Sequence, residues 1–131
     1  MFREIPAHVV SALRRAARAL FALALVLVFA GSVMKIAVGP DFRFSDKVGH
    51  AVVFFLLAAL AQLGYAERRT VARLMLALLG YGLFIELVQA LLPWREFSLW
   101  DWAADALGIA LCCGLAQGLR ERLATRGPVG P

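Results

Sequence analysis

Histidine and cysteine are scarce in this chain, which limits the chemistry it can carry. Its 131 residues include two histidines and two cysteines. Cys112 and Cys113 are adjacent in an apolar run, so they cannot form a disulfide with each other in a helix, and no second pair is present for a metal site. We therefore expect no metal and no cofactor. We interpret both cysteines as small apolar side chains, with palmitoylation as the alternative.

Charged residues are also missing from long stretches of the chain. Hydrophobic residues make up 62% of it, and a mean hydropathy of +0.77 is too apolar for a soluble domain of this size. Crossing a bilayer core of roughly 30 Å requires about 20 apolar helical residues. The pattern predicts an all-α protein, a four-helix transmembrane bundle. We expect a basic leader at 1–18, a membrane domain at 19–119 with helices at about 19–38, 48–66, 74–94 and 98–119, and a basic, disordered tail at 120–131.

The first apolar run has a second interpretation. Residues 20–30 resemble the apolar region of a signal peptide, and Val28-Phe29-Ala30 before Gly31 suits a signal peptidase. We favour an uncleaved helix, because the apolar character continues past this site to Val38. Either interpretation places the following segment outside the cytoplasm.

The basic residues are distributed unevenly around the apolar runs. A net charge of +5 and a pI near 10.0 are compatible with nucleic-acid binding. The bases, however, lie in short clusters between apolar runs, as the positive-inside rule produces, so we expect no nucleic-acid partner. Ten of the 14 Lys and Arg residues lie in the leader, the middle loop at 67–73 and the tail. This distribution predicts that both termini are cytoplasmic.

Six of the nine acidic residues lie on the opposite side, and two of these are deep within predicted helices. Glu86 is about eight residues from Trp94, or about 12 Å at 1.5 Å per residue, and Asp105 lies at a comparable depth. An ionised acid that faces lipid there costs at least about 2.5 kcal/mol. Both acids should therefore face the interior of the bundle and find partners.

Helical spacing places the other polar residues on shared faces. Residues three, four or seven positions apart lie on one side of a helix. Such sets are Asp46 with His50, Glu86 with Gln89, and Asp101 with Asp105 and Gly108. Three polar faces at one depth predict a polar pocket open to the outer face, in which either Lys47, His50 or Arg95 keeps Glu86 ionised or burial keeps it protonated. The ligand-binding residues expected from this pattern are Asp46, Lys47, His50, Glu86, Gln89, Arg95, Asp101 and Asp105.

Simpler structural roles are open for the same residues. Ser45 or Asp46 suits the N-cap of the second helix, and residues 98–101 fit a capping box at the start of the fourth. Four further polar residues have a different structural alternative to ligand binding. Each can snorkel at the membrane interface or form an interhelical hydrogen bond, such as Glu86 to Gln89. These residues are His50, Glu86, Arg95 and Asp105.

The polar residues and their order resemble the VanZ-like family of small bacterial membrane proteins. The matching elements are Phe44-Ser-Asp46-Lys47-Val-Gly-His50 followed by Phe54 and Phe55, then Glu86-Leu-Val-Gln89, Pro93-Trp-Arg95, Ser98-Leu-Trp-Asp101 and Asp105-Ala-Leu-Gly108. Together they cover about residues 44–118. Many family members carry Asn where Asp105 stands, so a role that needs a neutral amide at this position is in doubt.

The resemblance implies a four-helix fold in the bacterial cytoplasmic membrane and a cell-envelope setting. The family's namesake is linked to resistance to teicoplanin-type glycopeptides, while most members have no assigned activity. The resemblance therefore supplies a context and no reaction.

Three functions are compatible with such a pocket. The first is binding of a lipid headgroup, a cell-wall precursor or an amphiphilic, glycopeptide-type antibiotic, in a pocket rimmed by Trp94, Trp100 and Trp102. The second is a structural subunit of a membrane complex. The third is an intramembrane hydrolase or transferase with His50 as general acid or base, oriented by Asp46, and with Glu86 and Asp105 tuning its pKa or holding a divalent metal ion. No His-rich metal motif or nucleophile turn is present, which favours binding over catalysis. The pattern does not define an oligomeric state.

Overall fold

The described part of the chain is entirely helical. The computed structural model describes residues 5–35 and 43–125, with the side chains of 43–45 excluded, and these residues contain four α-helices and no strand. They are α1 (Ala7–Val33), α2 (Arg43–Gly64), α3 (Arg68–Gln89) and α4 (Leu99–Thr125). Each helix includes a segment long and apolar enough to cross a membrane. The predicted all-α fold with four helices capable of crossing a membrane is confirmed for the described residues.

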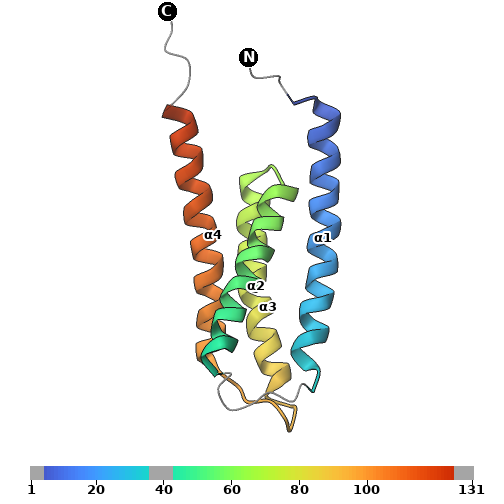
Figure 1. Cartoon of the computed structure of the whole chain (residues 1–131), viewed down its shortest axis with the longest axis vertical. Coiled ribbons are helices and arrows are strands. Elements are labelled where there is room, and N and C mark those ends of the chain that lie inside the picture. Colours follow the sequence, from blue (N-terminus) through green and yellow to red (C-terminus); the bar gives the residue numbers. More distant parts are fainter. Residues whose placement is uncertain (1–4, 36–42, 126–131) are drawn as a thin grey trace, which may run out of the picture.

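Helix α2 occupies the centre of the bundle. It packs most extensively against α4 and next against α1, while α3 lies beside it and contacts both α4 and α1. Figure 1 shows α2 and α3 between the two longer outer helices, with the start of α1 and the end of α4 at the same end of the bundle. The short α2–α3 connection lies toward that end, while the end of α1, the start of α2 and the α3–α4 connection lie at the opposite end. Four antiparallel crossings account for this arrangement.

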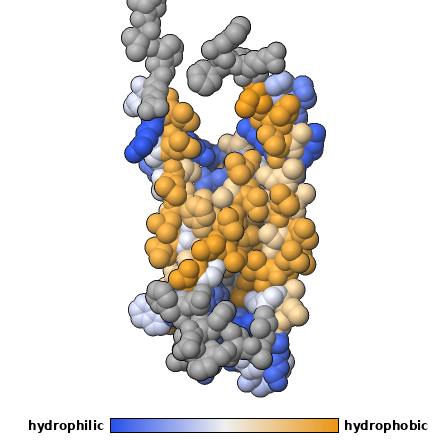
Figure 2. Space-filling view, in the orientation of Figure 1, coloured by the Kyte–Doolittle hydropathy of each residue, from blue (hydrophilic) through white to orange (hydrophobic). Residues whose placement is uncertain are grey.

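The centre of the bundle is filled from one face of α2. Phe54, Leu57, Ala58 and Ala61 of this helix are each at most 1% exposed. The two alanines allow a close approach of neighbouring helices, as small residues do in membrane bundles. Large apolar side chains elsewhere point outward, among them Leu20, Leu23, Val26, Leu56 and Leu115. Figure 2 shows a hydrophobic band across the middle of the visible face, with hydrophilic residues toward both ends.

The helix boundaries differ from the predicted ones, because charged residues continue the helices beyond the apolar runs. Helix α1 begins at Ala7 rather than near 19, and α4 continues to Thr125, so residues 7–18 of the predicted leader and residues 120–125 of the predicted tail are helical. An apolar run shows which part of a helix is compatible with contact to lipid. The helix itself continues as far as its backbone hydrogen bonds do. Residues 36–38 of the predicted first helix, and 126–131 of the tail, lie outside the described residues.

The last turn of the predicted leader is part of the bundle. The Arg18 Nε donates a hydrogen bond of 2.7 Å to the carbonyl oxygen of Gly64, and its guanidinium lies 4.7 Å from the centroid of the Tyr65 ring. This contact satisfies a carbonyl at the end of α2 and adds a cation–π interaction. The predicted boundary at residue 18 therefore separates residues that the structure joins.

Helix α3 ends earlier than predicted, at Gln89 instead of 94. Residues 90–94 form turns that include Pro93. A proline disfavours the helical conformation in the residue before it and removes a backbone donor, so the chain leaves the helix here. The early end shortens α3 and leaves residues 90–98 to connect it to α4.

Gly108 sets the closest approach in the bundle. A Cβ at this position would collide with the carbonyl oxygen of Ala51 on α2 and lie 3.0 Å from the backbone nitrogen of Phe55. Because both neighbours belong to the backbone, they cannot move without moving the helix. Gly108 therefore permits the α2–α4 contact on which the bundle depends.

We predict that Gly108→Ala destabilises the protein by about 1–3 kcal/mol, because α2 and α4 must separate to admit the methyl group. Gly114→Ala is the matched control on the same helix, since nothing lies within 4 Å of its Cβ position. Thermal unfolding in detergent, followed by circular dichroism, measures both variants. Equal midpoints for the two would contradict the inferred role of Gly108.

Candidate functional site

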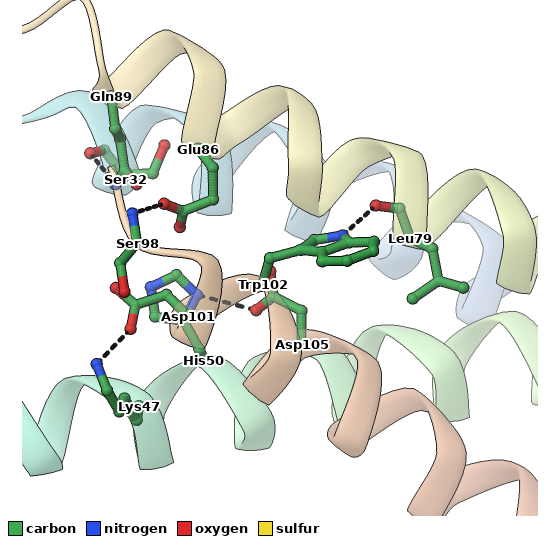
Figure 3. Close-up of polar contacts among 10 residues, drawn as sticks. All are labelled: Ser32, Lys47, His50, Leu79, Glu86, Gln89, Ser98, Asp101, Trp102 and Asp105. Atoms are coloured by element: carbon green, nitrogen blue, oxygen red, sulfur yellow. Dashed lines mark hydrogen bonds and ion pairs between the residues drawn. The ribbon is translucent and has the colours of Figure 1, made fainter. Parts of the chain in front are cut away.

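The polar residues gather at the end of the bundle opposite Ala7 and Thr125. Helix α2 begins there, α3 ends there and α4 begins there, as Figure 1 shows. Side chains near three helix ends consequently point into one region, and Figure 3 shows the residues that meet in it.

The innermost contact joins His50 of α2 to Asp105 of α4. The His50 Nδ1 lies 2.9 Å from Asp105 Oδ1, and the Asp105 side chain is 1% exposed. Gly82 on α3 makes room for this carboxylate, since a Cβ there would lie 2.6 Å from Asp105 Oδ2. A carboxylate only accepts hydrogen bonds, so Nδ1 carries the hydrogen when Asp105 is ionised and Nε2 is left as an acceptor.

The histidine is thus positioned by a different acid from the one expected. Asp46 shares a face of α2 with His50, as the spacing predicted, but the hydrogen bond of His50 goes to Asp105 on α4. The expectation that Asp46 orients His50 is wrong. A carboxylate one turn away on the same helix points along that helix, whereas a facing helix can present its carboxylate directly to the ring.

A second α2–α4 contact lies nearer the end of the bundle. The Lys47 Nζ donates to Asp101 Oδ1 at 2.7 Å. Asp101 is buried, while the Lys47 side chain is 40% exposed. Lys47 is therefore the partner of Asp101, although the sequence had offered it as one partner for Glu86. Asp101, Asp105 and Gly108 all contact α2, which confirms that they share one face of α4.

Glu86 is completely buried and fastens the start of α4 to α3. Its Oε2 accepts a hydrogen bond of 2.9 Å from the backbone N–H of Ser98, the residue that precedes α4. In the predicted capping box, the Asp101 carboxylate would accept the hydrogen bond from the Ser98 N–H. That prediction is wrong, because Glu86 of α3 accepts this bond instead. The other oxygen, Oε1, has no hydrogen-bond partner among the described residues.

Two further contacts connect α3 and the segment after it to the end of α1. The Gln89 Nε2 donates to the carbonyl oxygen of Ser32 at 3.0 Å, and the Trp94 Nε1 donates to that of Val33 at 3.4 Å. In place of the expected hydrogen bond between Glu86 and Gln89, Glu86 accepts a bond from the Ser98 amide and Gln89 donates one to the Ser32 carbonyl oxygen. Both contacts satisfy carbonyls at the C-terminal end of α1, which no longer have helical partners.

Two cavities adjoin at this end and share four polar residues. The first, of about 280 Å³, lies between α1, α2 and α3 and is lined mainly by apolar residues such as Leu27, Val28, Val53 and Phe54. The second, of about 540 Å³, is lined by polar residues and by aromatic residues of the α3–α4 connection. Both are lined by Asp46, His50, Gln89 and Arg95.

The structure brings all eight predicted site residues to this end, in two layers. Six line one or both cavities, while Glu86 and Asp105 lie behind them as buried supports. Asp46 lies in the first turn of α2, which begins at Arg43, so neither Ser45 nor Asp46 is the predicted N-cap. The six residues that line the cavities are Asp46, Lys47, His50, Gln89, Arg95 and Asp101.

The aromatic rim is smaller than predicted. Trp94 and Trp100 line the polar cavity. Trp102 instead points between helices, where its Nε1 donates to the carbonyl oxygen of Leu79 at 3.0 Å (Figure 3). The sequence placed it at the membrane surface because tryptophan favours that position, but the ring follows the side of α4 that faces α3.

Three of the clustered residues offer suitable donors for a metal ion. Asp46, His50 and Asp101 each present one ligand atom, and these atoms all lie within 4.8 Å of one another. The sequence grouped Asp46 with His50 on one helix face, but it did not join Asp101 to them as a ligand set, because Asp101 belongs to another helix about 50 residues farther along the chain. Ser32 was also missed, since its contribution is a backbone oxygen that carries no sequence signal.

Comparisons with known proteins identify one sequence relative and no known function. An uncharacterized protein of Schizosaccharomyces pombe (C11E3.10) is 32% identical over 110 residues, which are 82% of this chain and 66% of that protein. The match therefore spans slightly less than two thirds of the length of the yeast protein. No family model matches the chain, and no solved structure matches it.

We predict that Glu86→Ala destabilises the protein by about 1–3 kcal/mol and exposes the Ser98 amide, because a buried N–H loses its acceptor. Glu86→Gln keeps an acceptor oxygen and should retain most of the stability. Thermal unfolding and amide hydrogen exchange of residues 95–99 measure the two effects. Glu121→Ala, on an exposed residue at the far end of α4, is the control. Unchanged exchange at Ser98 in Glu86→Ala would argue against this capping role.

Proposed function

We propose that this chain is a multi-pass protein of the bacterial cytoplasmic membrane that binds a phospholipid, with the headgroup in the polar cavity and part of an acyl chain in the apolar one. The observation that carries the proposal is the pair of adjoining cavities of opposite character, joined at four shared polar residues. An amphiphile has the same division into an apolar and a polar part. Pockets of a few hundred Å³ with a few placed polar groups are typical of small-molecule sites.

The charges at the junction favour a phosphate-containing headgroup. Arg95 lines both cavities, and Lys47 lies on the wall of the polar one. An arginine guanidinium matches the geometry of a phosphate group and forms charge-assisted hydrogen bonds with it. The carboxylates of Asp46 and Asp101 favour the ammonium group of a zwitterionic headgroup by the same reasoning. Trp94 and Trp100 suit the boundary between headgroup and hydrocarbon.

The resemblance to the VanZ-like family supports an envelope setting for this binding. The residues that carry the resemblance include His50, Glu86, Arg95, Asp101 and Asp105, which form or support the two cavities. A relative in a fungus favours a ligand found in both kinds of cell. Fungal walls contain no peptidoglycan, so a membrane lipid suits both settings better than a cell-wall precursor or a glycopeptide does.

We further propose that both termini are cytoplasmic and that the cavities open toward the outer face. The motivation is the concentration of Arg residues at the end of the bundle where α1 begins and α4 ends. In this orientation Glu96 faces outward and Arg122 faces the cytoplasm. A ligand would then enter from the outer leaflet.

The orientation is tested by labelling introduced cysteines in intact cells. Glu96→Cys should react with a membrane-impermeant maleimide, while Arg122→Cys should react only after permeabilisation, because both positions are exposed but lie at opposite ends. Cys112 and Cys113 are replaced by alanine in both variants to remove background labelling. The reverse labelling pattern would place the cavities on the cytoplasmic side.

Lipid binding is tested by native mass spectrometry of protein extracted with its surrounding lipid. The wild type should retain one phospholipid, and Arg95→Ala should reduce retention by roughly 10–100-fold, because a charge-assisted hydrogen bond contributes about 1.5–3 kcal/mol. Arg122→Ala, in the last turn of α4, is the matched control and should retain lipid. Equal retention in both variants would support the structural-subunit alternative instead.

The apolar cavity is tested separately by filling it. Gly49 lines this cavity, and nothing lies within 4 Å of its Cβ position, so the side chain of Gly49→Leu has room to enter. We expect this variant to fold, to lose the two-chain phospholipid and to keep binding a water-soluble glycerophosphate headgroup. Gly114→Leu also has open space around it and does not line the cavity, so it should behave as the wild type.

A further inference from the structure

We propose that Asp46, His50 and Asp101 form a binding site for a divalent metal ion of the kind that accepts both nitrogen and oxygen ligands, such as Zn²⁺. This inference goes beyond the proposed lipid binding and does not depend on it. It rests on the arrangement of three ligands, a positioned histidine, a buried carboxylate oxygen and the balance of charge. Each of these is an independent feature of the same region.

The three donors are close enough to share an ion. Asp46 and His50 come from α2 and Asp101 from α4, and their ligand atoms all lie within 4.8 Å of one another. Around Zn²⁺, nitrogen and oxygen ligands at about 2.0–2.2 Å lie about 3.4 Å apart in a tetrahedron. Rotation of the Asp46 and Asp101 carboxylates closes the difference. Two carboxylates and one imidazole suit Zn²⁺ or Mn²⁺ better than Ca²⁺ or Mg²⁺, which favour sites made of oxygen alone.

Asp105 holds His50 as ligating histidines are held in known metal sites. A histidine that binds a metal through one ring nitrogen usually donates the other N–H to a carboxylate, which sets its orientation and raises its basicity. The Asp105 Oδ1 lies 2.9 Å from His50 Nδ1 and is buried, so the contact is fixed by the α2–α4 packing. Nε2 is then the nitrogen available for a metal ion.

Glu86 supplies the second, independent sign of a cation. The residue is fully buried, and among the described residues its Oε1 has no hydrogen-bond partner. Figure 3 shows this carboxylate directed toward the His50 ring, on the side away from α2. Buried polar atoms in native proteins are nearly always satisfied, and an unpartnered carboxylate oxygen is among the most expensive exceptions. A divalent cation beside His50 provides the missing stabilisation.

The formal charges of the surrounding residues favour a cation at this position. With His50 counted as neutral, and with Glu96 and Lys35 at the rim left out, the region holds two more carboxylates than cations. A divalent ion balances this excess. The residues counted are the acids Asp46, Glu86, Asp101 and Asp105 and the cations Lys47 and Arg95.

Lys47 competes with the ion for Asp101. Its Nζ occupies Asp101 Oδ1 at 2.7 Å, which leaves Oδ2 for a metal, and its side chain is 40% exposed and free to withdraw into the polar cavity. Three protein ligands complete only part of a coordination shell, so a water molecule or an oxygen of a bound headgroup can take another position. The site therefore lies where it can contact a phosphate in the polar cavity.

The test is zinc binding by the full chain in nanodiscs of a zwitterionic lipid, after removal of metal with a chelator. Competition with a fluorescent zinc indicator should show one Zn²⁺ per protein. His50→Ala and Asp46→Asn should each weaken binding at least about tenfold, and Asp105→Asn should weaken it about 10–100-fold through His50. His8→Ala is the matched control, because this second histidine lies in the first turn of α1 at the opposite end of the bundle, and it should bind as the wild type does.

Two outcomes would overturn the proposal. One is the absence of a stoichiometric Zn²⁺ in the wild type, and the other is equal affinity in the wild type and His50→Ala. Because a variant with impaired folding also loses zinc, the visible spectrum of the wild type with Co²⁺ is measured as well. It should show bands of a nitrogen- and oxygen-ligated ion that Zn²⁺ displaces, and their absence counts against the site. The readout is bound zinc and not retained lipid, and its variants, His50→Ala and Asp46→Asn, differ from Arg95→Ala of the lipid experiment, so the two results are separable.

Discussion

Placing acids inside a bundle of apolar helices imposes the strongest constraint on this structure. Asp105 lies away from water, so its carboxylate must be met by a donor from another helix, and His50 of α2 is that donor. The contact requires α2 and α4 to approach closely, which Gly108 permits one turn farther along α4. The polar pair and the glycine thus specify the same helix pairing, and the apolar residues of α2 fill the space around it.

The remaining polar contacts follow from that pairing. Once α4 lies against α2, Asp101 is one turn from Asp105 and faces Lys47, while the residue before α4 is brought to Glu86 of α3. The end of α1 and the start of α4 are each held by a side chain of α3, Gln89 and Glu86 respectively. A region built this way is rigid on its inner side, where Glu86 and Asp105 are buried, and accessible on its outer side, where Asp46, Lys47 and Arg95 line the cavities.

The sequence predicted which residues belong to the site, but it predicted few of the contacts between them. Helical spacing and the cost of burying charge were enough to place Glu86 and Asp105 inside and to group them with His50. They were not enough to choose partners, because a carboxylate is satisfied by any donor in reach and reach depends on how helices are rotated and offset. The expected bonds from Asp46 to His50 and from Asp101 to the Ser98 amide were local ones. The observed bonds come from other helices.

The sequence by itself determined that the chain forms four apolar helices with polar residues gathered at one end, because hydropathy and helical periodicity are properties of each segment alone. It did not determine where those helices end, since charged residues such as Arg68 and Arg120 are as compatible with a helix as apolar ones. Only the tertiary structure decided which side chains meet. Interhelical packing, which depends on all four helices at once, sets the hydrogen-bond partners of Trp102, His50 and Glu86.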